Sequence, residues 1–227
     1  MKDNFSTNSD LYLQYRPDYP EDFFGYLKAI RPDAENVWDC GTGNGQVAQR
    51  IARLYKNIFA SDMSQSQLDN AIRLNNIYYS VQPAEKTSFP SDFFDLIVVA
   101  QAVHWFDFDK FYLEVNRTAK PNALLVIMGY GRLKISDEVD TVIDNFYLNI
   151  IGSHWDKERK YIDENYQTIP FPFEELPVPE FKNVYEWTFD HLIGYLGTWS
   201  AVKHYIKDKG TNPLDLIYKD LKRTWGQ

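Results

Sequence analysis

A glycine-rich stretch near the start of the chain constrains the fold more than any other feature. An apolar run ends in Asp39, and then Gly41, Gly43 and Gly45 alternate before a helical pattern begins at Gln46. Glycine at alternate positions lets the backbone turn tightly and lets a ligand approach the main chain. The turn also leads into a helix N-terminus, whose free N–H groups can face a polar ligand. The stretch therefore predicts a strand, a nucleotide-type loop and a helix.

Strand and helix patterns alternate around this loop. A helical pattern covers 21–30, and the predicted strands cover 37–40, 57–61, 77–81, 93–100 and 123–128. Four helical patterns between these strands, and the nearly unbroken apolar run of 93–100, predict an α/β fold with a three-layer, doubly wound, mostly parallel sheet. Ligands of such sheets bind at the carboxyl ends of the strands. The residues at those ends are Asp39, Asp62, Gln82, Gln101 and Tyr130.

The pattern changes after Gly131. Helices are predicted over 139–151, 191–207 and 214–225, four prolines crowd 170–179, and 184–189 alternates like a sixth strand. We expect a single domain over 1–227, with its core at about 12–130 and 181–227. A helical cap of about 131–180 is inserted after strand five.

Composition excludes several classes of partner. Lys and Arg number 24 against 32 Asp and Glu, a net charge of −8, which disfavours nucleic acid and anionic membranes. The single cysteine, Cys40, allows no disulfide and no cysteine-based metal site, and we expect it to be a small buried residue. No apolar run approaches the length of a membrane span, so we expect a cytoplasmic protein without a bound metal.

The glycine loop can be compared with two nucleotide-binding sequence motifs. The dinucleotide fingerprint requires a further glycine where this chain has Gln46, so an NAD-dependent oxidoreductase is disfavoured. The form Asp39-x-Gly41-x-Gly43-x-Gly45 resembles motif I of class I S-adenosylmethionine (AdoMet)-dependent methyltransferases. In Asp62, the chain has an acid that can accept hydrogen bonds from both ribose hydroxyls.

Two further segments narrow the resemblance. Tyr15-Arg16-Pro17 with Tyr19-Pro20 before the loop, and His104-Trp105-Phe106-Asp107 after the fourth strand, resemble the small-molecule branch that includes trans-aconitate methyltransferase-like proteins. The resemblance covers about residues 12–130, with a further similar stretch at 197–200. The sheet of this family normally ends with strands six and seven. Here no candidate for strand seven is found, so either the sheet lacks its last strand or a distal piece is absent.

The resemblance implies roles for particular residues. It implies AdoMet as methyl donor, S-adenosylhomocysteine as product, and a small-molecule acceptor. The implied cofactor-binding residues are Tyr15, Arg16, Asp39, Gly41, Gly43, Gly45, Asp62, Met63, Gln82, Ala84, Glu85 and Gln101. The candidate substrate residues are Tyr12, His104, Trp105 and Trp199, with His104 as the candidate catalytic base or hydrogen-bonding residue.

Methyl transfer from a sulfonium is an in-line displacement that needs neither a metal nor a covalent nucleophile. A carboxylate acceptor is already ionised near pH 7, whereas a hydroxyl or carbon acceptor needs a base. Two readings stay open: an enzyme that methylates a small molecule, and a non-catalytic AdoMet-binding sensor or partner subunit. For either, we expect a monomer or homodimer.

Overall fold

The structure, a computed structural model, describes residues 14–226, and its chain divides into two compact units. Within the described residues, the first unit comprises 18–130 and 165–184, and the second comprises 14–17, 131–164 and 185–226. These boundaries differ from the predicted core and cap, because 165–184 packs with the sheet and the residues after 185 pack with the helices after 131. That residues 1–227 form a single domain stays a prediction.

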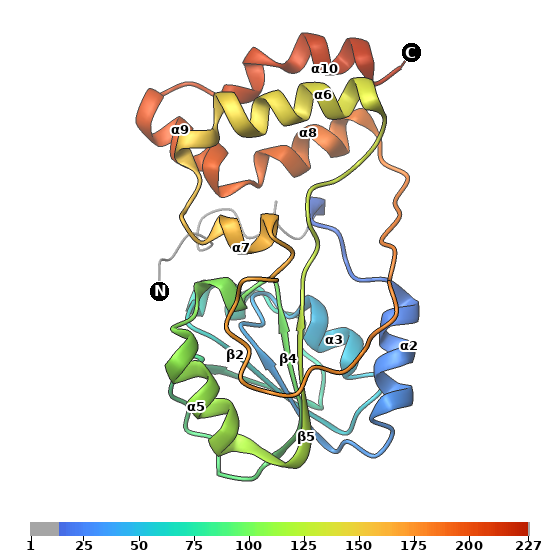
Figure 1. Cartoon of the computed structure of the whole chain (residues 1–227), viewed down its shortest axis with the longest axis vertical. Coiled ribbons are helices and arrows are strands. Elements are labelled where there is room, and N and C mark those ends of the chain that lie inside the picture. The colour runs from blue at the N-terminus through green and yellow to red at the C-terminus, as the bar shows by residue number, and fades with distance from the viewer. Residues whose placement is uncertain (1–13, 227) are drawn as a thin grey trace. The chain divides into compact units, whose positions relative to one another are not determined.

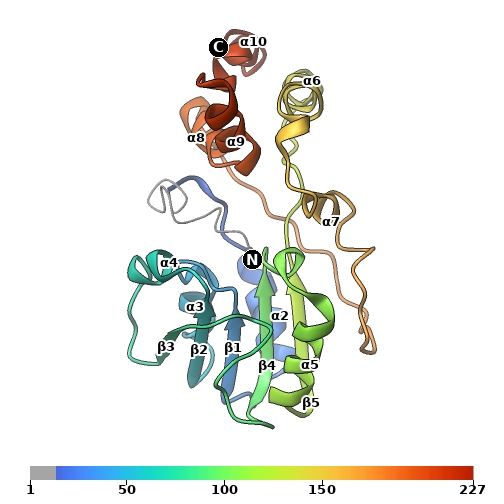
Figure 2. The same cartoon turned by 90° about the vertical axis from the view of Figure 1, so that its left-hand side faces the viewer.

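The first unit is built on the predicted sheet. Its five strands are all parallel and lie in the order β3-β2-β1-β4-β5 (Figures 1 and 2). Their bounds are β1 (Asn36–Cys40), β2 (Asn57–Asp62), β3 (Ile77–Val81), β4 (Phe94–Ala100) and β5 (Ala119–Met128). The order reverses between β1 and β4, where Asp39 pairs with Val98, so the glycine loop leaves the sheet at the position where such folds bind ligands.

Side-chain N-caps begin two of the helices of this unit. They are α2 (Glu21–Ile30), α3 (Gln46–Ile51), α4 (Gln65–Asp69) and α5 (Phe108–Thr118). Ser64 Oγ accepts the Gln67 N–H at 3.4 Å, and Asp107 Oδ1 accepts the Lys110 N–H at 3.3 Å, as expected for N-caps. The prediction of four helices between the strands is wrong. The connection from β3 to β4 contains Pro83 and Pro90 and forms no helix.

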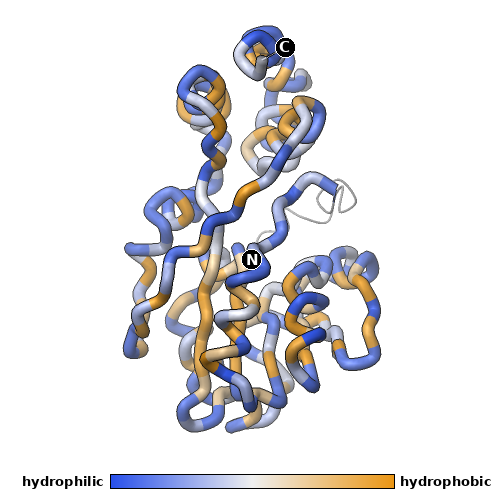
Figure 3. The backbone as a smooth tube through the Cα atoms, turned by 90° about the vertical axis from the view of Figure 1, so that its right-hand side faces the viewer, coloured by the Kyte–Doolittle hydropathy of each residue, from blue (hydrophilic) through white to orange (hydrophobic). Residues whose placement is uncertain are grey.

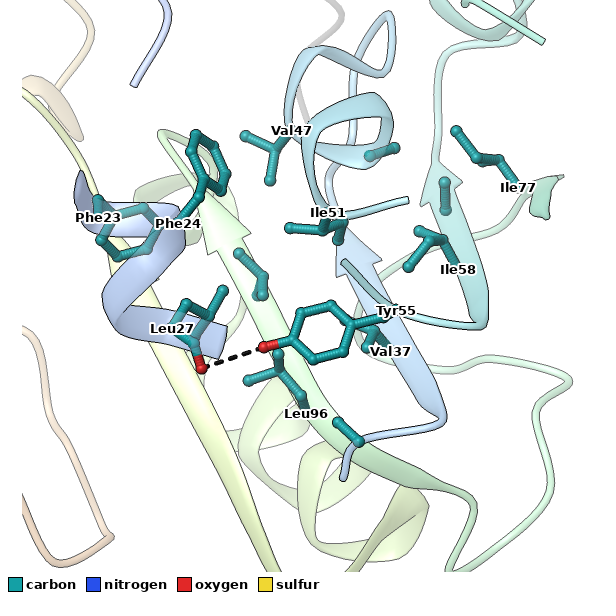
Figure 4. Packing of buried hydrophobic residues seen from close by; sticks show 14 residues of the cluster. Phe23, Phe24, Leu27, Val37, Val47, Ile51, Tyr55, Ile58, Ile77 and Leu96 are labelled. Carbon is teal, nitrogen blue, oxygen red and sulfur yellow. Dashed lines mark hydrogen bonds between the residues drawn. The ribbon is translucent and has the colours of Figure 1, made fainter. Parts of the chain in front are cut away.

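Aliphatic side chains fill the space between the sheet and α2 and α3. Val37, Leu96 and Val98 on the strands are fully buried, and they pack with Leu27 and Ile51 on the helices (Figure 4). The long apolar runs of the sheet lie in β4 and β5, and Figure 3 shows such extended hydrophobic stretches in the backbone of this unit. Burial on both faces explains why β4 could be recognised from its sequence.

The sheet ends at β5 within the described residues. The predicted sixth strand at 184–189 is wrong: Val184 is 82% exposed, and Thr188 caps α8, which begins at Phe189. Instead, the proline-rich segment 170–184 passes outside β5 (Figures 1 and 2). Aromatic contacts hold the segment at both ends, with Phe173 against Tyr112 of α5 and Phe181 against Phe23 of α2.

The second unit is helical. It contains α6 (Asp137–Asn145) with a π-helical continuation (Phe146–Ile150), a 3₁₀ turn (Gly152–His154), α7 (Arg159–Asp163), α8 (Phe189–Gly197), α9 (Ser200–Lys209), a 3₁₀ turn (Pro213–Leu216) and α10 (Tyr218–Thr224). The helix predicted over 191–207 is therefore two helices, separated at Thr198 and Trp199. Across the described part of the chain, no helix has the length and hydrophobicity needed to cross a membrane.

Gly25 lies on the exposed side of α2, and a Cβ built there meets no atom within 4 Å. Alanine restricts the unfolded chain and favours the helix, so we expect Gly25→Ala to raise the free energy of unfolding by about 0.5–1 kcal/mol. Urea titration followed by circular dichroism measures the change. An unchanged or lower stability would show that α2 is not a regular helix at this position.

Candidate functional site

The three glycines of the loop all have backbone conformations that other residues rarely adopt. Their φ angles are 72° at Gly41, 56° at Gly43 and 84° at Gly45. A Cβ at Gly41 would lie 2.6 Å from Cβ of Ala102, and one at Gly45 would collide with the hydroxyl of Tyr79. Glycine at these two positions therefore lets the loop approach the segment after β4 on one side and β3 on the other.

The end of β2 holds the loop in place. Ser61 O accepts the N–H groups of Gly41 and Thr42, at 2.9 and 3.0 Å. Asp62 accepts the Gly43 N–H through Oδ2 at 2.8 Å, and the Ser64 N–H through Oδ1 at 2.9 Å. These two contacts orient the carboxylate of Asp62 against the loop.

Asp39 lies at the end of β1 with only 1% of its surface exposed. Thr42 Oγ1 donates to its Oδ2 at 2.5 Å, while Oδ1 has no hydrogen-bond partner among the described residues. Burial raises the pKa of this carboxyl from 3.8 to about 7, against the opposing effect of the Thr42 hydrogen bond. Close by in the loop, the Nδ2 of buried Asn44 also has no partner in the described part of the chain. Asp39 Oδ1 and Asn44 Nδ2 are thus available to form hydrogen bonds with a ligand at the loop.

Negative charge gathers around the loop. Burial raises the pKa of the Cys40 thiol well above 9.0, and the charges of Asp39, Glu85 and Asp62 raise it further. The fully buried thiol is therefore protonated, and its expected role as a small buried residue is consistent with this environment. The same acids make the loop a favourable place for a cation.

The segment after β3 is engaged within the chain. Gln82 Nε2 donates to Ser80 Oγ at 2.8 Å, and its Oε1 accepts the Ser88 N–H at 2.8 Å. Glu85 Oε1 accepts the Asp107 N–H at 3.0 Å, which ties this segment to the start of α5. Of the other two candidates, Ala84 in this segment is buried, and Met63, directly after β2, is exposed.

The segment after β4 carries the other candidates of the first unit. Gln101 has a φ of 51°, and its Nε2 donates to Tyr130 O at 2.8 Å, which joins the ends of β4 and β5. His104 lies in a 3₁₀ helix (Val103–Trp105) and is 5% exposed. Its ring packs on Trp105, and its Nδ1 shares a 3.0 Å hydrogen bond with the hydroxyl of Tyr166.

Three candidates belong to the second unit. The ring of Tyr15 lies against Gly194 and contacts His191 edge-on, and Arg16 Nη2 donates to Thr198 O at 3.4 Å. Trp199 is 1% exposed and packs among aromatic rings, so packing alone explains its presence. These residues belong to a different unit from the glycine loop, and their contact with a ligand stays a prediction.

The candidate Tyr12 lies outside the described residues. Sequence reasoning missed Thr42, Asn44, Tyr79 and Tyr166, which contact the candidate residues or have buried polar atoms at the loop. Thr42 and Asn44 occupy the variable positions between the glycines, so the motif marks their place in the loop and not their chemistry. Tyr79 on β3 and Tyr166, which lies 62 residues beyond His104, carried no signal in the sequence.

The raised pKa of Asp39 predicts a pH dependence of stability. The folded protein keeps a proton that the unfolded chain releases above about pH 4, so the stability contributed by this proton is lost as the pH rises to about 7. At about 1.4 kcal/mol per pH unit, the loss is at most about 4 kcal/mol. Asp39→Asn should therefore gain stability relative to the wild type as the pH rises from about 4 to about 7 in urea titrations. Equal pH dependence of the two proteins would contradict the assignment.

Comparison with known proteins gives a consistent result. The family model described as "Methyltransferase domain" matches residues 38–127, which include the loop and β1 to β5. A protein of Dictyostelium discoideum, named "Putative methyltransferase", is 32% identical over 98% of this chain and 86% of its own length. An "Uncharacterized methyltransferase" of Mycobacterium tuberculosis is 26% identical, over 83% of this chain and 71% of its own.

A solved structure extends the agreement to three dimensions. It is described as a "Putative Type II Methyltransferase" from Anaeromyxobacter dehalogenans, and it matches with a TM-score of 0.86 and 37% identity. The match covers 94% of this chain and 91% of that one, so it includes both units. The chain therefore belongs to the class I methyltransferases, enzymes whose family implies S-adenosylmethionine as the methyl donor.

Proposed function

We propose that this enzyme transfers the methyl group of AdoMet to a small-molecule carboxylate by direct in-line displacement. The observation that carries the proposal is the glycine loop, where Asp39 Oδ1 and Asn44 Nδ2 are buried without partners in the described structure. Beside them, the N–H groups of Gly43 and Ser64 hold the carboxylate of Asp62 at the loop. These groups fit the polar parts of AdoMet.

The proposed contacts follow from the chemistry of each group. Asp62 would accept the ribose hydroxyls, Asp39 and Asn44 would face polar groups at the loop, and the glycines would let the ligand reach the main chain. When bound, AdoMet supplies an electrophilic methyl group on a sulfonium. The acids around the loop favour that positive charge. The further cofactor residues expected from the sequence, from Tyr15 to Gln101, belong to the same proposal.

The chain's part in the reaction is to align the acceptor and exclude water. Alignment of two reactants lowers the activation free energy by about 7–11 kcal/mol in well-oriented systems. His104 is the residue we propose for the acceptor, because it is buried after β4 and the close approach of Gly41 to Ala102 keeps this segment beside the loop. Toward an ionised carboxylate it acts as a hydrogen-bonding residue, since no proton has to be removed.

The proposal for the acceptor also uses the sequence. The segments around Arg16 and His104 resemble the trans-aconitate methyltransferase-like branch, whose acceptors are small molecules. The net charge of −8 supports a small molecule over nucleic acid as the partner. Trp105 and Tyr12 remain proposed contacts of the acceptor.

Isothermal titration with AdoMet, S-adenosylhomocysteine and NAD tests the donor site. We expect the first two ligands to bind and NAD not to bind. Asp62→Asn should weaken AdoMet by about 10- to 100-fold, because hydrogen bonds to a charged group are lost. Gly45→Ala should abolish binding through its clash with Tyr79, whereas the control Gly25→Ala should bind normally. Undiminished binding by Asp62→Asn and Gly45→Ala would place the donor elsewhere.

Methyl-transfer assays of His104→Gln over a panel of metabolites test the acceptor. With carboxylates, we expect kcat to fall by about tenfold, the value of one hydrogen bond, with the Kd for S-adenosylhomocysteine unchanged. A fall of about 100-fold or more, confined to hydroxyl or carbon acceptors, would identify His104 as a general base and reject the carboxylate. AdoMet binding without turnover of any acceptor would instead support a non-catalytic sensor.

A further inference from the structure

Tyr166, a residue outside the predicted site, shares a side-chain hydrogen bond with His104. Its hydroxyl lies 3.0 Å from Nδ1, and the imidazole tautomer decides which group donates. The two rings are also nearly parallel, with centroids 5.9 Å apart and 27° between their planes. Because His104 is 5% exposed, this contact holds a buried ring by both an edge and a face.

The backbone around Tyr166 is shaped to make this contact. Asn165 and Tyr166 have φ angles of 51° and 60°, in the left-handed region that residues with side chains seldom adopt. Two such residues in succession cost free energy, and they persist only where the surroundings impose them. The turn follows α7 and delivers the tyrosine to the ends of β4 and β5.

Gly129, just after β5, makes room for the tyrosine ring. A Cβ at this position would lie 2.9 Å from Cε2 of Tyr166 and 3.3 Å from its hydroxyl oxygen. Any larger residue would therefore displace the ring from His104. The absence of a side chain at Gly129 and the left-handed turn at Tyr166 thus both allow the hydrogen bond to His104.

We infer that Tyr166 is a positioning residue for methyl transfer, which fixes the orientation of the His104 ring. The inference rests on the proposed function for the role of His104 in turnover, but the contact itself does not depend on that role. A hydroxyl can donate to Nδ1 or accept from it, so the contact holds the ring in place with either tautomer. Tyr166 therefore sets the direction in which His104 presents Nε2 to an acceptor.

Nuclear magnetic resonance of the ring nitrogens tests the positioning without any substrate. The chain has four histidines, so the signals of His104 are identified as those lost in His104→Gln. We expect Tyr166→Phe, which keeps the ring and removes the hydroxyl, to move the ¹⁵N signals of His104. Gly129→Ala should move them too, because it displaces the ring. Unmoved signals in both folded variants would overturn the inference.

Tyr112→Phe is the matched control. Tyr112 is a buried tyrosine of the same unit, and its hydroxyl has no hydrogen-bond partner in the described structure. Its replacement should leave both the His104 signals and turnover unchanged. A change in the His104 signals as large as that of Tyr166→Phe would show that they report general repacking, and would overturn the inference.

Turnover tests whether Tyr166 acts through His104. We expect Tyr166→Phe to lower kcat by about tenfold with the Kd for AdoMet unchanged, and to have little further effect when added to His104→Gln. An equal effect in both backgrounds would assign Tyr166 an independent role and overturn the inference. If His104→Gln leaves turnover intact while Tyr166→Phe moves the ring signals, the role proposed for His104 fails and the positioning contact stands.

Discussion

The hydrogen bond from the Gly43 N–H to the carboxylate of Asp62 ties the glycine loop to the end of β2. Without it, a loop of three left-handed glycines would have many conformations available, because glycine has no side chain to restrict it. The bond therefore converts a flexible sequence into a fixed surface. The approach to Ala102, the burial of Asp39 and the contact with Tyr79 all require this one placement of the loop.

Local patterns in the sequence predicted the sheet unit well. The strands are short apolar runs between clear turn residues, and the N-caps at Ser64 and Asp107 are set by neighbours three residues away. The missing helix between β3 and β4 has a local cause in its prolines, whereas two other failures depend on partners distant in the chain. Residues 184–189 alternate like a strand, yet no strand lies beside them, and Thr188 caps a helix instead. The contact of Tyr166 with His104 spans 62 residues and has no local signature.

In the candidate site, too, local motifs could be predicted and contacts between distant residues could not. The glycines, Asp39 and Asp62 form a compact motif, so their meeting at the loop could be foreseen. Thr42 and Asn44 occupy the variable positions of that motif, where sequence alone assigns no chemistry. The donor side is thus encoded in adjacent residues. The acceptor side depends on segments joined only by folding, which is why the family is clear from the sequence and the acceptor is a proposal.

The proline-rich segment beside β5 bears on how these molecules behave in a crowded solution. An outer strand with unpaired N–H and C=O groups is a template on which another chain can add a strand and begin an aggregate. Proline has no N–H to donate, so the prolines of 170–179 prevent this stretch from pairing as a further strand. The ring contacts of Phe173 and Phe181 nevertheless keep the segment beside β5. Loss of either aromatic contact would therefore lower the solubility of the protein before it changed the free energy of unfolding much.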